Sequence, residues 1–200
     1  MESLPASYGI VQKSFKPGDI LIRQGDDINQ AYVIIDGIAK CYIREDNGKD
    51  YIFEFLGRGE ITGDLEAIQK APCLCNIEAL TAMEVYVLPY HLFSRFMLEK
   101  QEFNELIVKE LVTRIVQTCR RASYQQLYPV EYGLLRLLML EADQQISFSK
   151  KDMAAYLGIS VRSFNRTIHD LRAKNVLDEQ DLSIGITTKE LEQLLRRFEE

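Results

Sequence analysis

Two arginines four residues apart, Arg162 and Arg166, carry the side chains best suited to reading another molecule. An arginine can donate two hydrogen bonds at once to the O6 and N7 atoms of a guanine. On a helix, side chains four residues apart lie on one face, so both arginines can enter the same groove. This pattern predicts a DNA-reading helix whose main base contact is Arg166. The full predicted DNA-binding set is Lys150, Val161, Arg162, Ser163, Asn165, Arg166 and His169.

Four cysteines offer a second kind of chemistry: Cys41, Cys73, Cys75 and Cys119. Cys73 and Cys75 are separated by one residue, and alternate residues of a β-strand point to the same face. On a strand, their sulfurs can therefore converge on a metal, a thiol-reactive ligand or a disulfide switch. The alternative interpretation is that these cysteines are small buried apolar residues with no chemical role. The sequence does not show whether Cys41 lies near them.

Catalysis is not indicated by any group of residues. We find no nucleophile–histidine–acid set, no glycine-rich phosphate loop and no helical metal-ligand motif. The only histidines are His91, expected on the surface at a helix start, and His169. The sequence therefore predicts no catalytic residue and no metal ligand.

Composition limits the class of protein. The 200 residues are 46% hydrophobic, which is enough for one large or two modest domains, and the net charge is −6. An acidic chain is not a general nucleic-acid binder, but residues 149–174 hold six basic and two acidic side chains. No apolar run is long enough to cross a membrane, and residues 1–15 do not resemble a signal peptide. We therefore expect a cytoplasmic protein with reduced thiols and no membrane partner.

The elements that must position Arg162 and Arg166 are two short helices joined at a glycine. Ser149 can cap the first helix, and Asp152 follows three residues later, as in a capping box. Gly158 occupies the turn, where a positive φ is needed. Ser160 can cap the second helix, whose buried face is predicted to comprise Phe164, Ile168 and Leu171.

The first half of the chain reads as short strands separated by turn residues. Strands this short and this regularly spaced predict a β-barrel or jelly roll. The predicted strands are 9–15, 20–24, 31–36, 38–44, 50–56, 76–81 and 83–88.

Helical periodicity begins after Pro89. We predict helices over 90–100, 101–127, 130–142 and 189–198, and a hairpin-like wing over 176–186. The long helix has an apolar stripe, widened by Val108, Val112 and Val116, that exceeds what one face of a roll can cover. A second copy of the chain is the natural cover, and packing within the chain is the alternative. The predicted dimer interface is Phe103, Leu106, Ile107, Leu111, Ile115, Cys119 and Ala122.

A β-roll, a long helix and a winged helix-turn-helix in this order resemble the family of the cyclic-AMP receptor protein and FNR. The likeness covers nearly the whole chain. In the roll it rests on residues 15–25, 31–37, 47–49 and 59–64, and the helix pair is an independent match. Within the family the chain looks most like the YeiL-type regulators. The resemblance implies an effector pocket at Gly63, Asp64, Leu65, Cys73, Leu74 and Cys75.

Departures from the family pattern argue against its usual ligands. In nucleotide-binding members, an acidic residue matching Asp64 holds the ribose, and an arginine about ten residues later pairs with the phosphate. Here Ala71 to Asn76 contains no arginine or lysine, so a buried phosphate would lack a cation. No cysteine precedes Cys41, which argues against an FNR-type iron–sulfur cluster. The effector therefore stays unknown, and cyclic nucleotides are disfavoured.

The reading helix departs from the family pattern as well. An Arg-Glu pair opens that helix in the best-known members, and the matching positions here are Val161 and Arg162. Losing the glutamate removes an acceptor for a cytosine amino group, so the operator should differ from the receptor protein's half-site.

The sequence thus predicts an α+β protein that regulates transcription as a homodimer on a pseudo-palindromic operator of double-stranded DNA. Its expected parts are a cyclic-nucleotide-binding-like jelly-roll sensor over 1–100, a dimerisation helix over 101–127 and a winged helix-turn-helix over 128–200. RNA polymerase is a further candidate partner. The alternative function is a ligand-sensing or regulatory interaction module that has lost DNA binding.

Overall fold

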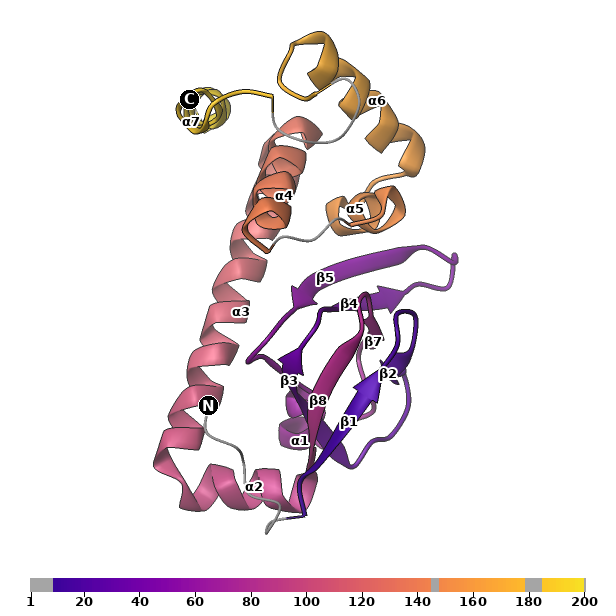
Figure 1. Cartoon of the computed structure of the whole chain (residues 1–200), viewed down its shortest axis with the longest axis vertical. Coiled ribbons are helices and arrows are strands. Elements are labelled where there is room, and N and C mark those ends of the chain that lie inside the picture. The colour runs from indigo at the N-terminus through magenta and orange to yellow at the C-terminus, as the bar shows by residue number, and fades with distance from the viewer. Residues whose placement is uncertain (1–8, 145–147, 179–184, 200) are drawn as a thin grey trace. The chain divides into compact units, whose positions relative to one another are not determined.

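The fold was examined in a computed structural model, which describes residues 9–144, 148–178 and 185–199 (Figure 1). The chain divides into two compact units, Met1–Ile115 and Val116–Glu200. The long helix α3 (Gln101–Leu127) contributes to both units.

The first unit is a roll of two four-stranded antiparallel sheets. Alternating apolar residues on the strands fill the space between the sheets, among them Ile34, Leu56 and Val85, each at most 1% exposed. The first sheet has the order β1 (Val11–Phe15), β8 (Met83–Pro89), β3 (Gln30–Asp36) and β6 (Ile61–Thr62). The second has the order β2 (Ile20–Ile22), β7 (Asn76–Ala79), β4 (Ala39–Arg44) and β5 (Asp50–Leu56). The predicted jelly roll is confirmed.

Two elements of the roll were not predicted, the short strand β6 and the helix α1 (Asp64–Gln69). Gly63 precedes α1 with φ of 80°, and a Cβ there would lie 3.0 Å from the Gln30 carbonyl oxygen. Only glycine tolerates both conditions without strain.

Cys73 and Cys75 do not lie on a strand, so the condition under which their sulfurs would point to one face is not met. Strand β7 begins at Asn76, so both cysteines lie in the irregular segment before it. There the backbone bonds to another loop: the Cys73 N–H donates to the Asp26 carbonyl, and the Cys73 carbonyl accepts from the Gly25 N–H. The alternation of a strand therefore does not bring the two sulfurs to one face.

Helices α2 (Tyr90–Glu99) and the first part of α3 close one side of the roll. The Phe103 ring packs edge-on against Phe93 and Phe96, with centroids 5.5 Å and 5.7 Å away. Ile107 is 1% exposed and belongs to the same cluster. The start of α3 is therefore held by its own roll.

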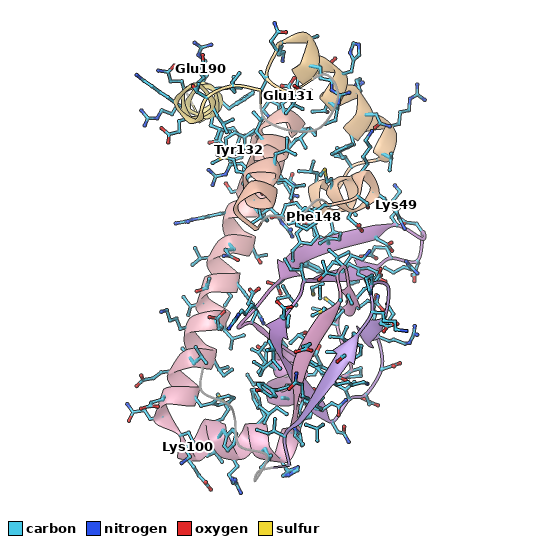
Figure 2. The ribbon with its side chains drawn as sticks, viewed as in Figure 1. Lys49, Lys100, Glu131, Tyr132, Phe148 and Glu190 are labelled. Atoms are coloured by element: carbon cyan, nitrogen blue, oxygen red, sulfur yellow. The ribbon has the colours of Figure 1, made fainter. Side chains whose placement is uncertain are left out.

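The second unit contains α4 (Val130–Gln144), α5 (Lys150–Leu157), α6 (Val161–Ala173) and α7 (Thr188–Glu199). Tyr132 of α4 is labelled in Figure 2. Its ring contacts the rings of Tyr124, Tyr128 and Phe198, so it joins α4 to α3, to the segment after α3 and to α7. The tip of the predicted wing, 179–184, lies outside the described residues. At its base, the Gly185 N–H donates to the Val176 carbonyl at 2.9 Å.

Candidate DNA-binding surface and sensor pocket

The turn between α5 and α6 forms as its residues predict. The Ser149 hydroxyl accepts from the Asp152 N–H at 3.0 Å, and the Ser160 hydroxyl accepts from the Ser163 N–H at 3.1 Å. Gly158 ends α5 with φ of 69°. Each cap satisfies an amide that a helix start would leave unbonded, so the starts of both helices are fixed by local residues.

Helix α6 has one anchored face and one open face. Phe164, Ile168 and Leu171 are at most 4% exposed, which confirms the predicted buried face. On the opposite face, Ser163 is half-buried and the remaining predicted DNA contacts of α6 are exposed: Val161, Arg162, Asn165, Arg166 and His169. Lys150, at the start of α5, is exposed as well.

The basic residues around α6 fall into two groups. Lys174 pairs with Glu131 at 2.8 Å, and Arg172 donates to the Asp178 carbonyl at 2.8 Å, so both brace the unit itself. Among the described residues, no carboxylate forms a salt bridge with Arg162 or Arg166. These two guanidinium groups are therefore available for an anionic or hydrogen-bond-accepting partner.

Tyr156 joins α5 to the C-terminal part of α3 within the second unit. The Arg121 guanidinium lies 4.5 Å from the centre of the Tyr156 ring, and the Gln125 amide donates to the Tyr156 carbonyl at 2.9 Å. Burial and a hydrogen bond with Tyr156 raise the pKa of Tyr124. Three α3 side chains thus hold one residue of the helix pair, an arrangement that the sequence did not reveal.

A small cavity lies at the position predicted for the effector pocket. Its volume is about 30 Å³, and five of the six predicted pocket residues line it. The predicted lining residues found there are Gly63, Asp64, Leu65, Leu74 and Cys75. Cys73 is not among the lining residues; it is buried, and burial raises its pKa to about 11.

Arg114 of α3 enters this cavity and was missed by the sequence analysis. Its guanidinium Nη1 lies 3.2 Å from Asp64 Oδ2, and its Nη2 donates to the Ile61 carbonyl. Its Nε lies 3.7 Å from Glu54 Oε2. Burial acts to lower the pKa of Arg114, but Asp64 and Glu54 outweigh it and the pKa is raised. The sequence does offer one signal for this role. Arg114 is a basic residue seven positions after Ile107, which places it on the face of α3 that packs on the roll.

A second cavity, of about 210 Å³, lies between the roll, α2 and α3. Its lining is almost wholly apolar, with the Glu110 side chain contributing a carboxylate. The residues that line it include Ile10, Val33, Leu88, Phe96 and Ile107.

The outer face of α3 carries exposed apolar side chains. Val108, Val112 and Ile115 are 49%, 53% and 61% exposed, and Cys119 and Ala122 continue the same spacing of four and three residues. By contrast, Phe103, Ile107 and Leu111 pack on their own roll. These three belong to the predicted interface; within a single chain Ile107 is buried, and Phe103 and Leu111 are half-buried.

The described part of the chain contains no helix long and apolar enough to cross a membrane. In the same residues, no group of three or more His, Cys, Asp or Glu side chains is placed to hold a metal ion.

Two family models match the chain, one for each end. Residues 12–100 match the cyclic nucleotide-binding domain, and residues 134–197 match the Crp-like helix-turn-helix domain.

Known proteins resemble the chain over different lengths. The cAMP-dependent protein kinase regulatory subunit of Dictyostelium discoideum is 26% identical over 140 residues, covering 67% of this chain and 43% of that protein. The cAMP-activated global transcriptional regulator CRP of Haemophilus influenzae is 21% identical over 177 residues, covering 83% of this chain and 79% of that protein. A Eubacterium rectale structure, described as a transcriptional regulator of the crp/fnr family, superposes with a TM-score of 0.80 at 16% identity. It covers 95% of this chain and 91% of that one, a likeness that concerns the fold alone.

A cyclic-nucleotide-binding-like roll, a long helix and a helix-turn-helix with an open cationic face define a DNA-binding transcription regulator. The chain belongs to the Crp/Fnr family. The finer resemblance to YeiL-type regulators stays a prediction.

Proposed function

We propose that this regulator binds DNA as a homodimer, with α6 of each copy in the major groove of one half of a two-fold operator. The observation that carries the proposal is the division of α6 into a buried apolar face and an open face with Arg162 and Arg166. A reading helix needs this division, because one side must be held while the other enters the groove. Arg166 is the proposed base contact, while Lys150, Ser163 and His169 approach phosphates.

The outer face of α3 supports a two-fold partner. Spacings of four and three residues between Val108, Val112, Ile115, Cys119 and Ala122 are those of a coiled-coil seam. We refer to these five residues as the α3 seam. Each lies open to solvent in a single chain, and a parallel second copy of α3 would cover all of them at once. Leu106, exposed beside the seam, can widen the contact.

The effector is proposed to differ from a cyclic nucleotide. The cavity at Asp64 has a volume of about 30 Å³, whereas ligand pockets usually measure roughly 300 Å³ or more. Among the described residues, Arg114 is the only cation lining it, and it is already paired with Asp64. Moving Arg114 to a ligand phosphate would leave a buried carboxylate without its partner, which is costly. The apolar cavity of about 210 Å³ is the roomier place for a small effector.

The alternative, an interaction module without DNA binding, is less well supported. Such a module has no use for Arg162 and Arg166, which no carboxylate of the described residues pairs with, on the open face of a capped helix. The proposed function acts by binding rather than catalysis, it places the protein in the cytoplasm with its DNA, and RNA polymerase is the further proposed partner.

Selection of binding sites from random-sequence duplexes tests the proposal. The parent protein should enrich a motif with two-fold symmetry and half-sites one DNA turn apart. A variant with Arg162→Ala and Arg166→Ala should enrich no motif, while its circular dichroism stays unchanged because both side chains are exposed. Enrichment of the same motif by both proteins would refute the assignment of α6.

A further inference from the structure

Two cysteines far apart in the sequence meet in the roll. The Cys41 and Cys75 side chains both line the small cavity that holds Arg114, and Cys75 packs against the core cluster that contains Cys41. Strand β4 places Cys41 opposite Ile77 of β7, and Cys75 lies two residues before Ile77. Cys41 is 8% exposed and Cys75 is half-buried, and both are free thiols.

We propose that Cys41 and Cys75 form a redox-active dithiol that closes to an intramolecular disulfide when it meets a hydroperoxide. This is a modification site, and it differs from the pairing of Cys73 with Cys75 that the sequence suggested.

The chemistry proceeds in two balanced steps. The Cys75 thiolate attacks the terminal peroxide oxygen, the O–O bond breaks, and Cys75 becomes a sulfenic acid while the alkoxide leaves as an alcohol or water. The Cys41 sulfur then attacks Cys75 sulfur, forming the S–S bond and breaking the S–O bond. The Cys41 proton leaves with the hydroxyl group as water. In total the two thiols lose two protons and two electrons, and the peroxide is reduced.

The surroundings assign the two roles. Cys75 is the more exposed of the two residues, so it meets the oxidant first. Interaction with the Cys75 side chain and burial raise the pKa of Cys41, which keeps that thiol protonated and protected until its neighbour is oxidised.

The other two cysteines lack this arrangement. Cys73 is 3% exposed and does not line the cavity, and burial raises its pKa. Cys119 lies exposed on α3, outside the roll.

Formation of the disulfide would change the wall of the cavity, because both cysteines line it. Disulfides usually require Cα atoms within roughly 7 Å of each other, and Cys75 lies in an irregular segment that can adjust to this limit. The neighbouring Leu74 N–H donates to Glu66 of α1 at 3.2 Å, so any adjustment at Cys75 reaches α1. The dithiol itself does not depend on DNA binding. Its effect on operator affinity rests on the proposed function.

The test uses the full chain with Cys119→Ser, which removes the exposed thiol that could link two copies. The protein is treated with hydrogen peroxide, blocked with N-ethylmaleimide and digested without reductant. Mass spectrometry should show the Cys41 and Cys75 peptides joined, two hydrogens lighter than the separate thiols, and dithiothreitol should separate them. Cys41→Ala in this background should instead accumulate a Cys75 sulfenic acid that dimedone traps. The matched control, Cys73→Ala, should still form the disulfide.

Three outcomes would overturn the dithiol: no linked peptide in the folded protein, a Cys73–Cys75 link, or no dimedone adduct in the Cys41→Ala variant. Operator affinity is measured separately on reduced and oxidised protein. A disulfide that leaves affinity within about twofold overturns only its regulatory effect. A protein that forms the disulfide but binds no DNA in either state refutes the proposed function and leaves the dithiol in place.

Discussion

The guanidinium of Arg114 lies 3.2 Å from the carboxylate of Asp64, a residue 50 positions earlier in the chain. The Asp64 side chain is only 2% exposed and that of Arg114 is 13% exposed. This buried ion pair fastens α3 to the roll at the site where family members that bind nucleotides would hold a ribose. The Arg114 guanidinium thus lies where the ligand of those family members would be expected.

Breaking this pair should destabilise the first unit. Arg114→Ala leaves Asp64 buried without a partner, and the expected loss in the free energy of unfolding is about 3–5 kcal/mol. A matched control is Arg95→Ala, because Arg95 forms an exposed pair with Glu99 that should contribute below about 0.5 kcal/mol. Urea unfolding of both variants measures the two effects. An equal loss in the free energy of unfolding for both variants would show that the buried Arg114–Asp64 pair stabilises the protein no more than an exposed pair does.

The Arg114–Asp64 pair also shows where sequence reasoning stops. The helix pair was predictable because its caps, turn glycine and apolar anchors are local, and Ser149, Gly158 and Ser160 act within a few residues of their own positions. The strands were predictable for the same reason. The ion pair depends on how α3 packs against the roll, and no local pattern around Asp64 encodes that packing.

Long-range packing also explains what the sequence could not show about the cysteines and about α3. Cys75 meets Cys41 through the pairing of β4 with β7, a long-range register that spacing cannot give. The apolar stripe predicted along α3 includes residues that pack on the roll and residues that are exposed in a single chain. Ile107 packs on the roll and Ile115 faces outward, and only the packing of α2 and the roll divides them.

A charge in the α3 seam should separate the copies. Ile115 is 61% exposed, so Ile115→Asp should leave the single chain folded while placing two carboxylates together in the dimer. Sedimentation should show a monomer at micromolar concentration, and affinity for a two-fold operator should fall at least tenfold. Thr113→Asp is the control, since Thr113 is exposed on α3 outside the seam and should stay dimeric. A monomeric parent protein at the same concentration would defeat the prediction.

The two classes of DNA contact should be separable by competition. Arg166→Ala removes the proposed base contact, so specific binding should weaken by about 1–3 kcal/mol and discrimination at that base pair should relax. Lys150→Ala removes a proposed phosphate contact and should weaken all duplexes alike. Gel shifts with specific and unrelated competitor DNA measure the difference. Unchanged discrimination by Arg166→Ala would show that the base contact lies elsewhere.

Alkaline pH should destabilise the roll through Cys73. Burial raises the pKa of this thiol to about 11 from an ordinary value of 9.0, so the unfolded chain loses its proton first as pH rises. The stabilisation is complete below pH 9 and is lost as pH rises toward 11. Between pH 8 and 10, the urea midpoint of the parent should therefore fall more than that of Cys73→Ala. If the urea midpoints of both proteins fall equally with pH, Cys73 does not contribute to the pH dependence, since the other titrating groups are common to both proteins.

Cyclic nucleotides should not bind with useful affinity. The segment from Ala71 to Asn76 offers no cation for the phosphate. The nearest guanidinium, Arg114, already bonds to Asp64 and the Ile61 carbonyl. Titration calorimetry with cAMP and cGMP should show no saturable heat at micromolar concentrations of ligand. Arg114→Ala serves as the comparison, because freeing the cavity removes its only lining cation and should not create a site. Saturable binding by the parent that Arg114→Ala abolishes would contradict the prediction and show that Arg114 can leave Asp64 for a phosphate.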